Sequence, residues 1–175
     1  GGATGVRAEI YALLGEAYRA EGQLGELVKI LEAETGQDTQ RLALLGGLYE
    51  ETGAVDKAIA TYRKVLAADS RAIDVRIRLV HLLQTAGALD EAVKEYEALI
   101  KAAPSNPDFV FELSETLVAR DERDKALKLL TDLEARAQGE PETLAAIADF
   151  YERSEEKAKA MKVSVSGSPC ARASR

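Results

Sequence analysis

The stretch from Leu42 to Pro104 contains the same residue pattern twice, and this repetition constrains the fold more than any other feature. Each member of the first copy has a counterpart 34 positions later, as with Tyr62 and Tyr96. The first copy is Leu42, Leu45, Gly46, Tyr49, Gly53, Ala58 and Tyr62, and the second is Arg76, Leu79, Val80, Leu83, Gly87, Ala92 and Tyr96. A fixed offset of this size indicates a stack of similar structural units.

The pattern extends beyond these two copies. Tyr11-x-x-Leu14-Gly15-x-x-Tyr18 matches the segment from Leu42 to Tyr49 at an offset of 31, so the link around Gly36 is three residues shorter. Apolar residues recur at helical spacing in every copy. The sequence therefore predicts four helix pairs and a partial fifth, at about residues 8–38, 39–72, 73–106, 107–140 and 141–163.

Residues that stop helices separate these segments. Gly53 and Gly87 follow the first helix of their copies, and Asp121 stands where the fourth copy needs the turn residue. Asp tolerates left-handed backbone better than most residues, so it can replace glycine there. The spacing predicts helices over about residues 6–20 and 55–68, with Pro104 and Pro107 closing the third copy.

These residues resemble the tetratricopeptide repeat, a helix-turn-helix of 34 residues. Tyr11, Leu14, Gly15 and Tyr18 match the first-helix motif, and the alanine–tyrosine pairs Ala58/Tyr62 and Ala92/Tyr96 match the second. The fourth copy lacks the glycine and tyrosine, and the first has Leu27 and Leu31 in place of alanine and an aromatic residue. The resemblance implies an all-α, right-handed superhelical solenoid of antiparallel helix pairs.

The two ends of the chain depart from the pattern. Gly1–Gly5 looks like the trimmed end of a longer chain or an expression remnant, and residues 164–175, small and polar, read as a disordered tail. The repeats would thus occupy residues 6–163 and lack a polar cap at the C-terminal end. Leu144 and Tyr151 are expected on an open apolar face, which favours contact with further sequence or with a second chain.

Composition excludes several classes of function. The net charge of −7 and the isoelectric point near 4.9 argue against nucleic acid or an anionic membrane as the main partner. Apolar runs stay well short of the ~20 residues that a membrane helix needs, so no direct membrane insertion is expected. Cys170 is the only cysteine, which fits a reducing compartment without excluding a periplasm. The compartment stays undetermined, with the cytoplasm slightly favoured over a periplasm or organelle.

Motifs for catalysis or cofactor binding are missing from the sequence. His81 and Cys170 are the only residues of their kinds, so histidine and cysteine cannot build a zinc site. Gly46-Gly47 lies inside a predicted helix rather than in a phosphate-binding loop. The many carboxylates are explained by solvated helix faces, because paired-acid catalysis also needs a pocket. We therefore expect no enzyme activity, cofactor or metal.

In a tetratricopeptide-like solenoid, the first helix of each pair lines a concave groove. Helical spacing opposite the packed residues selects the candidates for binding a peptide there. These are Glu16, Arg19, Glu50, Asp74, Arg78, His81, Gln84, Phe111, Glu115 and Asp149. An acidic groove with apolar spots at Ile77 and Phe111 favours a basic or amphipathic peptide. Alternatively, Ile77 and Phe111 pack neighbouring helices, and His81 is a core or groove-wall residue rather than a pH switch.

The family's best-known binding mode is a clamp of Lys, Asn and Arg on the C-terminal carboxylate of a chaperone tail. Ala12, Glu16, Ala43 and Gly47 stand where such residues are expected, which disfavours that role. The sequence instead predicts a non-catalytic scaffold that binds a partner peptide or helix. Two alternatives stay open: an assembly module that forms homo-oligomers through its C-terminal face, and an accessory domain of a larger protein.

Overall fold

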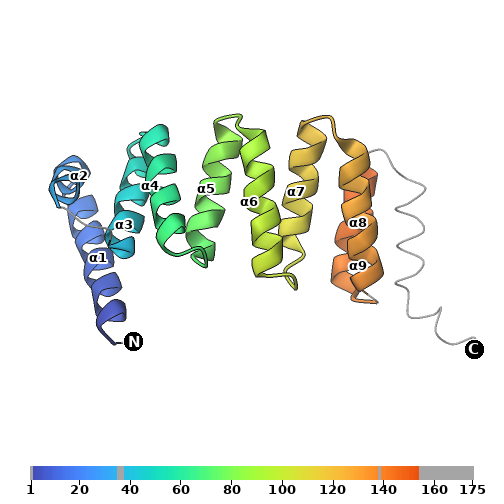
Figure 1. Ribbon diagram of the computed structural model, residues 1–175, viewed down its shortest axis with the longest axis horizontal. Helices are drawn as coiled ribbons and strands as arrows, with labels where there is room; N and C mark the ends of the chain where they lie inside the picture. Colours follow the sequence, from blue (N-terminus) through green and yellow to red (C-terminus); the bar gives the residue numbers. More distant parts are fainter. Residues whose placement is uncertain (1, 35–37, 138, 154–175) are drawn as a thin grey trace, which may run out of the picture. The chain divides into compact units, whose positions relative to one another are not determined.

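The described part of the chain is entirely α-helical in its regular structure. A computed structural model describes residues 2–34, 38–137 and 139–153 (Figure 1). The helices are α1 (Gly2–Ala20), α2 (Leu24–Ala33), α3 (Thr39–Glu51), α4 (Val55–Ala68), α5 (Ile73–Thr85), α6 (Leu89–Ala102), α7 (Asp108–Ala119), α8 (Arg123–Ala137) and α9 (Pro141–Arg153). The prediction of a helix over residues 55–68 is confirmed, whereas α1 begins earlier than the predicted start at residue 6.

Left-handed turn residues separate the helices of four pairs. Gly22, Gly53 and Gly87 have φ angles of 69°, 75° and 73°, which glycine adopts without steric cost. Asp121 adopts a φ of 62° at the equivalent position of the fourth pair. The prediction that Asp121 replaces the turn glycine is therefore confirmed. The short link around Gly36 and the tail at residues 164–175 lie outside the described residues.

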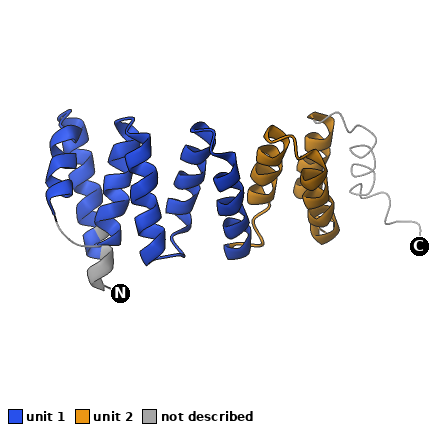
Figure 2. Cartoon of the chain, turned by 45° about the horizontal axis from the view of Figure 1, so that its top comes forward, with its two compact units in different colours: residues 1–102 blue, residues 103–175 orange. Residues whose placement is uncertain are grey.

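The helices form two compact units, residues 1–102 and residues 103–175, shown in different colours in Figure 2. In the first unit, α3 packs against α1, α2 and α4, and α5 packs against α4 and α6. In the second unit, α8 packs against both α7 and α9. Within each unit, a helix thus buries apolar surface against the other helix of its pair, and neighbouring pairs pack against each other.

Small and large side chains alternate in the core of the first unit. Ala58 and Ala92 are fully buried, and Tyr62 and Tyr96 are 0% and 2% exposed. A β-carbon on Gly46 would lie 2.7 Å from Cδ1 of Tyr62, which is well inside van der Waals contact. The small residues Gly46 and Ala58 therefore allow the two helices of the pair to cross closely.

Candidate functional site

The first helices of the pairs carry the residues predicted to bind a peptide. In the first unit they lie on α1, α3 and α5, and in the second unit on α7 and α9. The first set is Glu16, Arg19, Glu50, Asp74, Arg78, His81 and Gln84, and the second is Phe111, Glu115 and Asp149. We call the first set, with Glu51, the inner face of the first unit.

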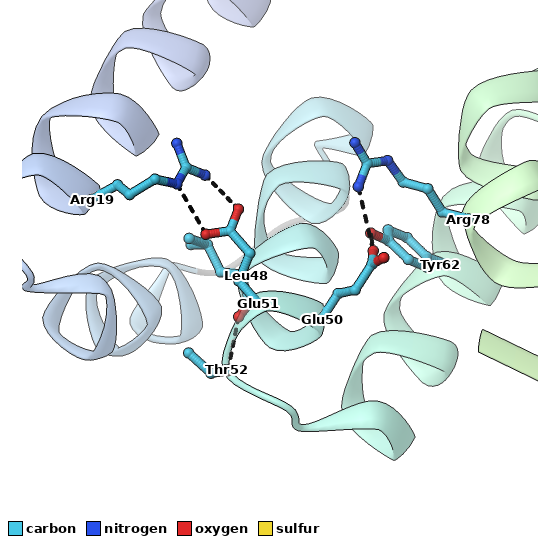
Figure 3. Close-up of polar contacts among 7 residues, drawn as sticks. All are labelled: Arg19, Leu48, Glu50, Glu51, Thr52, Tyr62 and Arg78. Atoms are coloured by element: carbon cyan, nitrogen blue, oxygen red, sulfur yellow. Dashed lines mark hydrogen bonds and ion pairs between the residues drawn. The ribbon is translucent and has the colours of Figure 1, made fainter. Parts of the chain in front are cut away.

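An ion pair joins α1 to α3 on this inner face. The guanidinium of Arg19 donates two hydrogen bonds to the carboxylate of Glu51, one of them 3.1 Å from Nε to Oε2 (Figure 3). The hydrogen bond and charge of Glu51 raise the pKa of Arg19. Both side chains stay substantially exposed, at 49% and 39%. Glu51 is not among the candidate binding residues predicted from the sequence.

A second set of polar contacts joins α3 to α5. Arg78 lies 3.4 Å from the carboxylate of Glu50, and the hydroxyl of Tyr62 on α4 donates to the same carboxylate at 2.8 Å (Figure 3). Burial and the acceptor Glu50 together raise the pKa of Tyr62, which keeps its phenol protonated. Glu50 thus contacts both Tyr62 and Arg78. Ion pairs therefore connect α1 to α3 and α3 to α5.

The remaining polar groups of the inner face are less constrained. Glu16, Asp74 and His81 are exposed and make no side-chain hydrogen bond or ion pair within the described residues. Gln84 accepts a hydrogen bond from the hydroxyl of Tyr96 at 3.2 Å. The exposure of His81 excludes its placement in the core.

The second unit repeats the ion-pair arrangement on its own first helices. Arg153 on α9 donates to Glu115 on α7 at 3.1 Å and to Asp149 on α9 at 2.9 Å. These two carboxylates, Glu115 first, raise the pKa of Arg153. Phe111 is half-buried, so it combines packing with partial exposure. Arg153 was missed by sequence analysis, because charge alone does not show which neighbouring helix a side chain reaches.

These contacts change the expected character of the surface. Acidic side chains still outnumber arginines on the inner face of the first unit, but Glu50 and Glu51 already have cationic partners. Exposed ion pairs of this kind contribute little net free energy, so another cation can compete for the carboxylates. The inner face of the first unit therefore still carries more acidic than basic side chains, but its ion pairs partly neutralise that negative charge.

The sequence predicts an open apolar face at the C-terminal end, but the two residues expected on that face are buried. Leu144 and Tyr151 are 6% and 1% exposed, so both belong to the core of the second unit. Large exposed apolar side chains gather instead on α1, where Val6, Ile10 and Leu13 are 55%, 56% and 60% exposed.

Two further structural features are absent from the described residues. That part of the chain contains no group of three or more histidine, cysteine or carboxylate side chains placed to hold a metal ion. None of its helices is both long and apolar enough to cross a bilayer.

Comparison with known proteins identifies the fold. A family model described as tetratricopeptide repeat matches residues 8–165. Solved structures of MamA proteins are similar along almost the whole chain, at 16–24% identity in three examples. A MamA RS-1 double mutant has a TM-score of 0.66 and 16% identity, with 89% of each chain covered. MamA MSR-1 has a TM-score of 0.58 and 24% identity, covering 93% of this chain and 95% of that one.

A third structure is MamA from Desulfovibrio magneticus RS-1, from residue 41 to its end. Its TM-score is 0.64 at 16% identity, with 91% of this chain and 92% of that chain covered. A search among curated proteins finds no match. Likeness at these identities establishes the fold alone, and it confirms the prediction of an all-α solenoid of helix pairs.

Proposed function

Because this chain belongs to the tetratricopeptide repeat family, we propose that it binds a basic or amphipathic segment of a partner protein on its first helices. Repeats of this family build protein–protein interaction scaffolds that are generally non-catalytic, and this chain has their architecture. The proposal adds the surface and the chemistry of the partner.

The single observation that carries the proposal is the inner face of the first unit. Ion pairs link α1, α3 and α5 there, while Glu16 and Asp74 make none within the described residues. A lysine or arginine of a partner could pair with Glu16 or Asp74 without first breaking an internal contact. The net charge of −7 would speed the approach of a basic segment.

Apolar anchors would supply the remaining affinity. Ile77 on α5 and Phe111 on α7 are half-buried, so each offers part of its surface within its own unit. A few such contacts commonly dominate the binding free energy of a peptide, whereas surface charges govern the association rate. An amphipathic segment therefore fits the first helices better than a purely basic one.

The test uses a displayed library of random peptides as the probe, with the full chain as bait. We expect enrichment of peptides that combine lysine or arginine with apolar residues. The variant Glu16→Lys with Asp74→Lys should lower capture about tenfold, because two attractive charges become repulsive.

The matched control is Asp56→Lys with Glu97→Lys. Asp56 is the second residue of α4, as Asp74 is of α5, and Glu97 is exposed within α6, as Glu16 is within α1. This control carries the same change in net charge on second helices. Equal loss of capture in both variants would show that only net charge matters and would overturn the inner face as the site.

A further inference from the structure

A crevice in the first unit is lined by none of the predicted peptide-binding residues. It lies over α3, between α2 and α4, and has a volume of about 330 Å³. That volume is at the lower end of the range typical of sites for small molecules. Its lining residues are Glu32, Glu34, Arg41, Leu42, Leu45, Tyr49, Thr61 and Lys64.

Two residues that line the crevice have longer counterparts in the next repeat. Leu42 and Thr61 correspond, 34 positions later, to Arg76 and Glu95. Arg76 and Glu95 form an ion pair with side chains only 13% and 26% exposed, and Arg76 also donates to the carbonyl of Ser70 at 3.0 Å. Leucine and threonine are shorter and cannot form this pair. The third repeat thus has an ion pair at the positions where the second repeat has Leu42 and Thr61, two of the residues that line the crevice.

Thr61 contributes a hydroxyl to the lining. Thr61 is only 6% exposed, and within the described residues its side chain has no hydrogen-bond partner. Other threonines within or at the end of a helix donate to the carbonyl four residues earlier, at 2.8–2.9 Å: Thr52, Thr85, Thr116 and Thr131. The hydroxyl of Thr61 can therefore donate a hydrogen bond to an occupant of the crevice without first breaking one within the described residues.

The charged side chains of the lining differ in whether they already have a partner. Glu32 already accepts from Tyr49 at 2.5 Å and from Lys57 at 3.0 Å. Burial first, and Glu32 second, raise the pKa of Tyr49 to about 12, so its phenol stays neutral. Lys64, by contrast, forms no ion pair within the described part of the chain.

The other cation of the lining is committed to the fold. Arg41 is 5% exposed and donates to the carbonyl of Leu31 at 2.6 Å, and its Nε lies 3.8 Å from Glu34. Arg41 thus satisfies the C-terminal end of α2 and has little capacity left for an occupant.

We propose that this crevice binds a small organic monocarboxylate with a short, unbranched apolar chain. The carboxylate accepts hydrogen bonds from the ammonium of Lys64 and the hydroxyl of Thr61. The chain lies over Leu42 and Leu45, which are 7% and 6% exposed and form the apolar part of the lining. The internally paired carboxylates Glu32 and Glu34 disfavour a second negative charge on the occupant.

Hexanoate is the probe, titrated into the full chain at neutral pH, with 1-hexanol and hexylammonium as matched probes of different charge. Methyl-resolved NMR should show saturable shifts at Leu42 and Leu45 with hexanoate. Both other probes should bind at least about fivefold more weakly, because they lack the anion. Equal or tighter binding of 1-hexanol would overturn the assignment of an anion site.

Variants locate the site. Lys64→Met keeps the length of the side chain and should raise the Kd for hexanoate about fivefold, whereas Lys94→Met, on α6, should leave it unchanged. Equal effects of the two variants would overturn the role of Lys64. Thr61→Val keeps the shape and should also weaken binding.

A filling variant tests the geometric origin of the crevice. Leu42→Arg combined with Thr61→Glu places the pair of the next repeat in the second repeat and should abolish the saturable shifts. Hexanoate binding that survives in a folded filling variant would contradict the proposal. Should this variant not fold, the Lys64→Met and Thr61→Val titrations decide the matter alone.

Discussion

The second and third repeats share their core but differ in the contacts they make around it. Ala58 and Ala92 are fully buried at equivalent places, and Tyr62 and Tyr96 cross to the first helix of their own pair. Around this common core, the second repeat has Gly46 against the ring of Tyr62, and the crevice lies in the same repeat. The third has Val80 and a paired arginine in the equivalent places.

This difference separates two kinds of position in a repeat. Some positions that fill the helix pair carry the same residue in both repeats, as Ala58/Ala92 and Tyr62/Tyr96 do, since close packing restricts the side-chain volume there. Positions that face the preceding pair vary from Leu42 to Arg76 and from Thr61 to Glu95. These variable positions decide whether the junction between repeats is filled or open, and so where a ligand could bind.

The largest expected effect comes from replacing Gly46, which packs against Tyr62, with the valine that the third repeat has at the equivalent position. Gly46→Val should lower the free energy of unfolding by about 3 kcal/mol, because the new side chain overlaps the buried ring of Tyr62. Urea unfolding followed by circular dichroism measures this. Gly25→Val is the matched control, since a β-carbon on Gly25 would meet nothing within 4 Å. A stable Gly46→Val protein would show that the ring has room to move.

A smaller effect is expected from the ion pair that fills the junction of the third repeat. Arg76→Met should cost about 2 kcal/mol, because it leaves the half-buried carboxylate of Glu95 without its cation. Arg63→Met removes an equivalent charge from the exposed pair with Glu91 and should cost less than about 1 kcal/mol. Both values come from urea unfolding at low salt. Equal costs would mean that burial does not distinguish the two pairs.

The smallest expected effects concern the hydroxyls of the two tyrosines. Tyr62→Phe should cost about 1.5 kcal/mol, because the lost hydrogen bond has the charged acceptor Glu50. Tyr96→Phe should cost about 0.5–1 kcal/mol, because its acceptor Gln84 is neutral. Chemical unfolding of both variants gives the comparison, and a larger loss for Tyr96→Phe would reverse our ranking.

The raised pKa of Tyr62 adds a pH dependence to this comparison. In the folded protein the neutral phenol is favoured, so its contribution to stability is complete below the ordinary value of 10.0. That contribution is lost as the pH rises above 10.0, towards the raised pKa. Alkaline titration of the ultraviolet absorbance, with Tyr62→Phe as the control, should assign the latest-ionising phenol to Tyr62.

Much of the fold could be predicted because helix stops and buried positions are local or periodic. The offset of 34 located α4 and the turn at Asp121 without any knowledge of neighbours. The candidate residues were located on the first helices for the same reason. Which of them would meet a partner side chain was not predictable, since Arg19 reaches Glu51 across a distance of 32 positions.

The sequence by itself determined the helix pairs, their turns and the small residues where helices cross, because spacing and side-chain volume act within one repeat. Only the tertiary structure decided that Arg153 joins Glu115, that Leu144 and Tyr151 are buried, and that a crevice opens beside Thr61. The physical reason is that these features arise between helix pairs. There, the length and direction of individual side chains decide whether charges meet and whether space is filled.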